Sequence, residues 1–336
     1  MQNMPEDYML IAETAFSHEG DFGYLISQVD AAVEGGADCI KFQVFLDQKS
    51  YYAPSHPALR HIGNMIFSRQ EWERIFMYAS EKKLRILVLP LNVESFRFSF
   101  RFEELIYGYE IHSVCFNELS LLENMKETSR FIVLGVGGRL PQEINYALRH
   151  LQRDASEKVI LMYGFQSFPT DYRTLNLAKI QRLKDTFNCT MGYADHSSFE
   201  DNSFCDFTNV AYLLGSRWFE KHVIVEPGKK RVDFESAVGA DGLRKMRHEI
   251  DRLKITLGDS NIFHLNDAEL TYRSRGKKVA AQRDLLSGHI LCAEDIGFYV
   301  TEEAGDFDQI KYAELLGRRL RRDMKKGEPF RFGGME

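Results

Sequence analysis

The sequence predicts an α/β protein in which a (β/α)8 TIM barrel is followed by a small C-terminal domain. Eight short apolar runs recur along the first two thirds of the chain, and segments with helical periodicity fill most of the gaps between them. After residue 274 the apolar runs become shorter and glycine turns more frequent. Strands that alternate with helices form parallel sheets, and eight such units in about 220 residues favour a closed barrel.

The expected strands are short runs rich in aliphatic and aromatic residues. Their first residues lie 21 to 46 positions apart, which leaves room for one helix and two loops each time. The chain lacks both the Gly-x-Gly-x-x-Gly fingerprint and a phosphate loop ending in Gly-Lys-Ser/Thr, so the two commonest doubly wound folds are disfavoured. The eight strands are expected at Tyr8–Glu13, Cys39–Phe45, Arg85–Leu91, Tyr109–Phe116, Arg130–Val136, Lys158–Phe165, Thr190–His196 and Trp218–Ile224.

Three of the connecting segments show features of helices. The segment Asp21–Glu34 has apolar residues along one stripe and ends at Gly35-Gly36, a typical C-terminal stop signal. Gln70–Lys82 has the same periodicity. A third helix, Pro141–His150, begins with proline at a position where its missing N–H costs nothing.

The last quarter of the chain predicts a change of domain. A helix at about Ala240–Leu257 closes a barrel domain of residues 1–258, and the polar, mixed stretch 259–274 is typical of a linker. Residues 275–336 then carry short strands and glycine turns, which indicate a small separate domain.

Composition limits the possible classes of protein. Of the 336 residues 44% are hydrophobic and 27% charged, which is typical of a globular chain. The 43 Lys and Arg against 49 Asp and Glu give a net charge of −6, so a nucleic-acid partner is not expected. Neither an apolar run of about 18 residues nor a secretory signal is present, which argues against a membrane partner. Five scattered cysteines indicate reduced thiols and a cytoplasmic location.

Polar residues gather where the chemistry of a TIM barrel lies, at the C-terminal ends of the strands. Glu13 ends the first strand, Lys41 and Gln43 share one face of the second, and Glu220 and His222 share one face of the eighth. A buried charge without a partner costs several kcal/mol. We therefore expect these groups to compensate one another around a bound ion or an anionic substrate.

Two histidines give the sharpest hypothesis. His196 ends the seventh strand and His222 lies on the eighth, so neighbouring strands could bring both imidazoles onto one divalent metal ion. The alternative is that each is an ordinary hydrogen-bonded histidine. The other eight histidines have no such setting and are expected to be surface or structural residues. Glu13 is either a general base or a substrate ligand, or it forms a salt bridge to Lys41.

Several motifs, in the right order along nearly the whole chain, resemble the sialic acid synthase family. They are Ile11–Gly20 (IAETAFSHEG), Lys41-Phe-Gln43, Gly192–His196 (GYADH), Glu220-Lys-His222 and Asp233. Val279–Gly288 (VAAQRDLLSG) resembles that family's C-terminal SAF, or antifreeze-like, domain. The resemblance implies a barrel plus SAF domain in a domain-swapped homodimer. It also implies condensation of phosphoenolpyruvate with an N-acylated hexosamine-type aldose to a nine-carbon 2-keto acid.

The resemblance also implies roles for individual residues. His196 and His222 would hold Mn²⁺ or Mg²⁺, which polarises the open-chain aldehyde. Glu13 and Lys41 would be catalytic, with Glu13 handling the attacking water or a sugar hydroxyl and Lys41 contacting an anionic group. The substrate-binding residues would be Gln43, Ser113, Gln166, Glu220 and Asp233.

The sequence departs from the family pattern on the phosphoenolpyruvate side. Glu110 stands where the family has a phosphoenolpyruvate-binding lysine, and an acid at that point repels phosphate. Leu89, Gly135 and Ala194 replace hydroxyl residues, and the stretch 300–303 lacks the arginine that reaches a partner's sugar site. Two alternatives to a nonulosonic acid synthase therefore remain open. One is a metal-dependent sugar enzyme with another donor or reaction, and the other is a non-catalytic sugar-binding paralogue.

Overall fold

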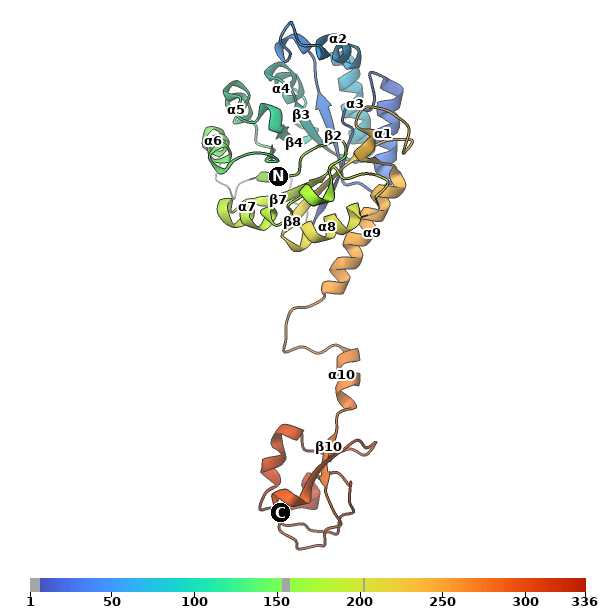
Figure 1. Cartoon of the computed structure of the whole chain (residues 1–336), viewed down its shortest axis with the longest axis vertical. Helices are drawn as coiled ribbons and strands as arrows, with labels where there is room; N and C mark the ends of the chain where they lie inside the picture. The colour runs from blue at the N-terminus through green and yellow to red at the C-terminus, as the bar shows by residue number, and fades with distance from the viewer. Residues whose placement is uncertain (1–6, 153–157, 202) are drawn as a thin grey trace. The chain divides into compact units, whose positions relative to one another are not determined.

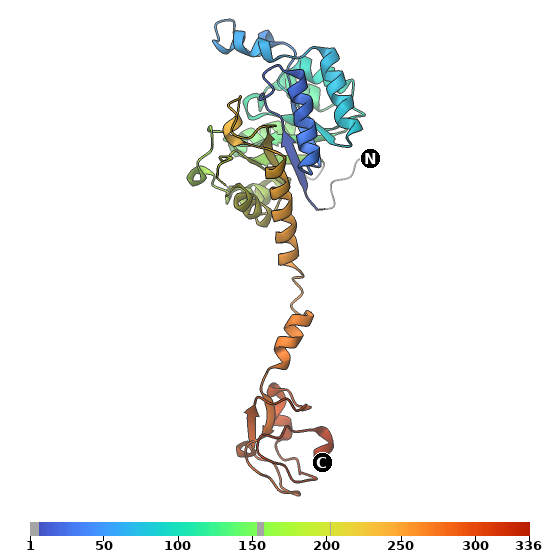
Figure 2. The ribbon, with the colours of Figure 1, turned by 90° about the vertical axis from the view of Figure 1, so that its right-hand side faces the viewer.

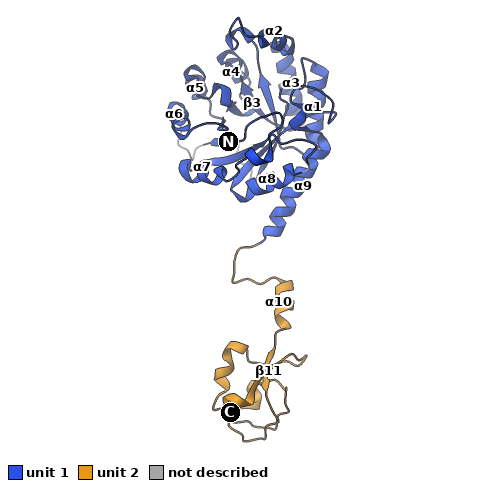
Figure 3. Ribbon diagram, in the orientation of Figure 1, with its two compact units in different colours: residues 1–258 blue, residues 259–336 orange. Residues whose placement is uncertain are grey.

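The computed structural model describes residues 7–152, 158–201 and 203–336. The described residues up to Gly258 form one compact unit and those from Asp259 to Glu336 form a second (Figure 3). In the first unit eight parallel strands follow one another in chain order, and pairing of β8 with β1 closes the barrel (Figure 1). The predicted fold class is therefore confirmed.

All eight expected strands are present, most within two residues of their expected ends. The fourth strand differs, because it begins three residues earlier than expected and ends five residues earlier, before the short 3-10 turn Ser113–Cys115. The strands are β1 (Met9–Glu13), β2 (Cys39–Val44), β3 (Arg85–Pro90), β4 (Ile106–Ile111), β5 (Phe131–Gly135), β6 (Val159–Tyr163), β7 (Thr190–Asp195) and β8 (Ser216–Val223). A two-residue strand, β9 (Ala237–Val238), adds to the end of β8.

Helices cover the outside of the barrel, as the two perpendicular views show (Figures 1 and 2). The Asp21 side chain caps α1, and Ser68 and Glu71 form a capping box on α3. The helices around the barrel are α1 (Phe22–Glu34), α3 (Arg69–Glu81), α4 (Val93–Phe100), α5 (Leu119–Met125), α6 (Pro141–Leu151), α7 (Lys179–Phe187), α8 (Phe204–Leu213) and α9 (Ala240–Leu257), and the short α2 (Ala58–Ile62) lies in the segment between β2 and α3.

The barrel has two apolar layers, because side chains along each strand alternate between the interior and the helices. Met9 and Ile11 point inward, where they pack with the large rings of Phe131 and Trp218. Leu10 and the other outward-facing residues pack against the helices. Toward the C-terminal ends of the strands, the barrel interior is lined by polar side chains instead of apolar ones.

Two strands, β4 and β8, contain an extra residue that reverses this alternation. In β4, Ile106 lies opposite Ile86 but Gly108 lies opposite Leu87, so Tyr107 is inserted and Glu110 is turned into the barrel. Glycine is required at position 108, since a Cβ atom there would lie 2.9 Å from the Phe131 carbonyl oxygen.

The second unit is a small domain with its own core. Strands β10 (Lys278–Ala281) and β11 (Ile296–Tyr299) form an antiparallel pair over buried residues such as Val279, Phe307 and Phe330. The expected linker is only partly irregular, because α10 (Asp267–Ser274) forms within it, started by a capping box of Asn266 and Glu269. None of the helices in the described part of the chain combines the length and apolarity needed to cross a membrane.

Candidate active site

A cavity of about 290 Å³ opens at the C-terminal ends of the barrel strands. Of the nine residues predicted as site residues, eight line it. They are Glu13, Lys41, Gln43, Ser113, Gln166, His196, Glu220 and His222. The ninth, Asp233, accepts a hydrogen bond of 2.7 Å from the Gln166 amide and so lies one contact away. Residues from β1, β2, β7 and β8 are thus brought to one place.

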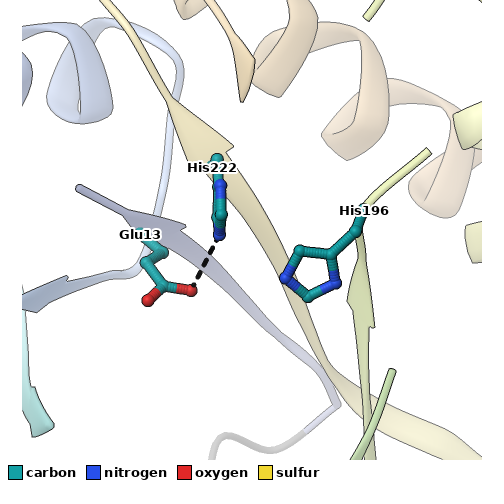
Figure 4. Close-up of side chains that lie close together, drawn as sticks. All are labelled: Glu13, His196 and His222. Atoms are coloured by element: carbon teal, nitrogen blue, oxygen red, sulfur yellow. Dashed lines mark ion pairs between the residues drawn. The ribbon is translucent and has the colours of Figure 1, made fainter. Parts of the chain in front are cut away.

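Glu13, His196 and His222 form a cluster with the composition of a metal site (Figure 4). One ligand atom from each residue lies within 4.8 Å of those from the other two. His222 Nε2 is 3.3 Å from Glu13 Oε2, and the two imidazole rings are 4.9 Å apart, nearly perpendicular. Two imidazoles and one carboxylate that converge in this way suit Zn²⁺, Mn²⁺ and related divalent ions.

The state of the imidazoles also fits a bound ion. Burial lowers the pKa of His196 to about 3, so that its ring is neutral at physiological pH, as a metal ligand must be. Its Nδ1 has no hydrogen-bond partner among the described residues although it is buried. The Nδ1 of His222 lies 3.4 Å from the Ser236 hydroxyl, a contact that helps to orient the ring.

Lys41 lies at the centre of three buried carboxylates. Its Nζ is 3.0 Å from Glu13 Oε2, 2.8 Å from Glu110 Oε2 and 2.7 Å from Glu220 Oε2. The salt bridge between Glu13 and Lys41, one of the two readings of Glu13, is therefore present, and the same carboxylate also faces the histidines. The charge of Lys41 is already compensated before any anionic substrate arrives.

The three carboxyl groups differ in their tendency to ionise. Burial, the largest single effect, would raise the pKa of Glu13, but Lys41, His222 and the hydrogen bond to Glu220 together lower this pKa well below its usual value. Burial raises the pKa of Glu110, and burial together with the charges of its carboxylate neighbours raises that of Glu220 well above its usual value. Of the three, Glu13 has the strongest tendency to be ionised, and its Oε1 accepts a 2.8 Å hydrogen bond from Gln43.

One histidine of the cavity escaped the sequence reasoning. His112 directly follows β4 and lines the cavity, a setting that the sequence analysis did not assign to it, while its side chain also caps the turn Ser113–Cys115. Burial lowers its pKa to about 4, and its Nδ1 accepts a hydrogen bond from the Val114 amide. The signal was its position directly after a strand, as for His196, but the expected fourth strand ran on to Phe116 and concealed it.

Most of the chain matches a known family. Residues 28–262 match the profile of the NeuB family, and residues 278–334 match that of the SAF domain. The N,N'-diacetyllegionaminic acid synthase of Campylobacter jejuni is 22% identical over 341 residues, which cover 96% of this chain and 98% of that protein. The N-acetylneuraminate-9-phosphate synthase of Drosophila melanogaster is 22% identical over 356 residues, which cover 95% and 94%.

Solved structures share the fold. The N-acetylneuraminic acid synthetase of Leptospira borgpetersenii superposes with a TM-score of 0.70 and 22% identity over 80% of this chain and 90% of that one. The spore coat polysaccharide biosynthesis protein SpsE of Bacillus subtilis gives a TM-score of 0.65 and 20% identity over 98% and 95%.

Proposed function

Because the chain belongs to the NeuB family, we propose that it is a nonulosonic acid synthase. In this reaction phosphoenolpyruvate condenses with an N-acylated hexosamine-type aldose to give a nine-carbon 2-keto acid. The observation that carries the proposal is the Glu13, His196 and His222 cluster inside a cavity at the C-terminal end of the barrel. The full-length similarity to synthases of legionaminic acid and N-acetylneuraminate 9-phosphate supports it.

The residues of the cavity have different roles in the proposed reaction. A divalent ion held by His196, His222 and Glu13, Mn²⁺ or Mg²⁺, would supply Lewis-acid polarisation of the sugar aldehyde. The low pKa of Glu13 keeps it ionised, the form that can also accept a proton from the attacking water. Gln43 holds the Glu13 carboxylate in place.

The remaining polar groups suit the sugar. Glu220 retains its proton more strongly than an ordinary carboxyl, so it can donate a hydrogen bond to a hydroxyl of the substrate. Asp233 and Gln166 form a hydrogen-bonded pair at the edge of the cavity, and we assign them to sugar hydroxyls as well. Ser113 lies near Glu110 and can contact an anionic group of the donor.

A second candidate reaction is favoured by the pairing of Glu110 with Lys41. Three carboxylates against one ammonium leave two negative charges when all are ionised, and a divalent ion would just balance them. The phosphate and carboxylate of phosphoenolpyruvate would then add further negative charge, while Lys41 and the divalent ion are already compensated by the carboxylates. A donor without phosphate, such as pyruvate, would bring less negative charge to the site. In that reaction a carboxylate of the site takes a proton from C3 of pyruvate, and C3 then bonds to the aldehyde carbon of the sugar. The aldehyde oxygen is protonated.

One assay separates these functions. The purified full-length protein with Mn²⁺ is incubated with phosphoenolpyruvate or pyruvate and a panel of N-acyl hexosamines and their 6-phosphates. We expect phosphate release with phosphoenolpyruvate and at least one sugar, and a 2-keto acid of matching mass. Product from pyruvate alone would establish the second candidate. Sugar binding without product from either donor would contradict both and indicate a non-catalytic paralogue.

We further propose that the protein is a domain-swapped homodimer. Apolar side chains between residues 255 and 272 are unusually exposed, including Ile262 at 85% and Phe263 at 88%. Such a run is typical of a surface that another chain covers. We expect the mass of a dimer in size-exclusion chromatography with light scattering. Ile262→Ser/Phe263→Ser should favour the monomer, whereas Leu213→Ser, at another exposed apolar residue, should not. A wild-type protein that is monomeric at micromolar concentration would contradict the proposal.

We also propose a cytoplasmic location, because all five cysteines are free thiols and disulfides are rare in that compartment.

A further inference from the structure

We propose that two buried polar links on the outer wall of the barrel set the spacing of the three candidate metal ligands. One link is the ion pair of Asp195 with Lys221, and the other is the amide of Gln28. None of these three residues lines the cavity, so they would be positioning residues. The inference rests on the metal site of the proposed function.

The first link joins the strands that carry the two histidines. Asp195 directly precedes His196, and Lys221 directly precedes His222, so both point away from the cavity when the histidines point into it. They lie opposite each other across β7 and β8, and Lys221 Nζ is 2.5 Å from Asp195 Oδ1. Both side chains are fully buried, with Lys221 beneath the Phe204 ring of α8.

The same pair also fixes the loop that follows β7. Lys221 Nζ donates a 2.8 Å hydrogen bond to the Ser197 carbonyl oxygen, and Asp195 Oδ1 accepts from the Ser197 amide and hydroxyl. The Tyr193 hydroxyl donates to Asp195 Oδ2. His196 is therefore flanked on both sides by residues that this network holds, although its own ring makes none of these contacts.

The second link joins the strands that carry Glu13 and His222. Gln28, a buried residue of α1, donates from Nε2 to the carbonyl oxygens of Thr14, at 3.2 Å, and Val223, at 2.7 Å. Thr14 directly follows Glu13, and Val223 directly follows His222. The same Nε2 is 2.9 Å from the Ser17 hydroxyl. Gln28 thus ties together the backbones next to two of the three candidate ligands.

The placement of these links indicates that they position the candidate ligands and do not only stabilise the fold. A metal ion needs its ligand atoms within a few tenths of an ångström of their bound positions, and backbone shifts between β1, β7 and β8 would separate them. Each link crosses one of the two strand boundaries that lie between the ligands, β7 to β8 and β8 to β1. A buried ion pair is by itself weak evidence for stability, because apolar replacements of similar volume are often as stable.

The test compares Mn²⁺ affinity with thermal stability in the full-length protein. Mn²⁺ binding is measured by electron paramagnetic resonance of the free ion, and melting is followed for the metal-free protein. Lys221→Met, Asp195→Asn and Gln28→Met should each weaken Mn²⁺ binding on the order of 10- to 100-fold. Arg247→Met is the matched control, because it removes a polar link to Asp38 and Gly36 before β2, at the other end of the barrel. It should lower the melting temperature without changing Mn²⁺ affinity.

The double variant Asp195→Asn/Lys221→Met separates positioning from stability. It removes the unpaired buried charge left by either single change, so its melting temperature should recover toward that of the wild type. Its Mn²⁺ affinity should stay low, since the link is still missing. Recovery of both quantities together, or wild-type Mn²⁺ affinity in the single variants, would overturn the positioning role. A wild-type protein that binds no Mn²⁺ would instead overturn the metal site itself, and this inference with it.

Discussion

Replacing either His196 or His222 with alanine is expected to lower turnover by at least about 10³-fold and to weaken Mn²⁺ binding strongly. Each change removes one of the three groups that converge within 4.8 Å. A bound ion stabilises the charge that develops on a carbonyl oxygen by several kcal/mol, and each 1.36 kcal/mol corresponds to a tenfold change in rate. The fold should persist, because these rings project from strand ends at the cavity and are not part of the apolar core.

The measurement pairs turnover with Mn²⁺ affinity and circular dichroism for each variant. His112→Ala is the control for metal binding, because His112 lines the same cavity but is not one of the three clustered groups. It should bind Mn²⁺ as the wild type does. If the His196 and His222 variants also retain wild-type affinity, the assignment of the ion to this cluster is wrong.

Replacing Glu110 with lysine is expected to raise kcat/KM for phosphoenolpyruvate on the order of 10- to 100-fold. The change replaces a carboxyl group beside Lys41 with an ammonium group, so that the net charge of the buried cluster rises by up to two units. A group next to Lys41 would then attract the phosphate instead of repelling it. At an effective dielectric constant of about 20, one unit charge at ~4 Å contributes about 4 kcal/mol before desolvation is subtracted, so a gain of this size is reasonable.

Glu110→Gln provides the matched control for this prediction. It removes the negative charge without adding a positive one, so kcat/KM should be lowest for the wild type, higher for Glu110→Gln and highest for Glu110→Lys. Phosphate release is measured over a range of phosphoenolpyruvate concentrations, with melting temperatures to confirm that each variant is folded. A folded Glu110→Lys variant that no longer consumes phosphoenolpyruvate would mean that Glu110 is itself part of the donor site. Activity with pyruvate that falls as phosphoenolpyruvate use rises would support the second candidate reaction.

The local sequence pattern was sufficient to predict the barrel and the placement of His196 and His222 at its strand ends. Alternating apolar runs and helical stripes identify strands and helices because side-chain direction repeats every two residues in one and every 3.6 in the other. Parallel strands place their C-terminal ends at one rim, so polar residues at the ends of strands far apart in sequence must gather there. That rule correctly brought Glu13 together with His196 and His222.

The limits of local pattern appear at the two strands with an inserted residue. In β4 the insertion of Tyr107 turns Glu110 into the barrel, and in β8 Ser216 lies opposite Met191 while Trp218 lies opposite Gly192. A period of two cannot reveal such a shift, because one extra residue reverses every later side chain and depends on the neighbouring strand. The contact of Glu110 with Lys41 is therefore known only from the pairing of the strands.

The amino-acid sequence by itself determined the barrel, the separate C-terminal domain and the strand ends from which the candidate ligands project. Only the tertiary structure decided that Glu110 and Glu220 share Lys41 with Glu13, and that Lys221 and Gln28 support the ligands from the outer wall. The physical reason is the separation along the chain over which each effect acts. Periodicity depends on residues that are neighbours in sequence. Charge compensation in a buried site is set instead by side chains that come within about 3 Å of each other from strands dozens of residues apart.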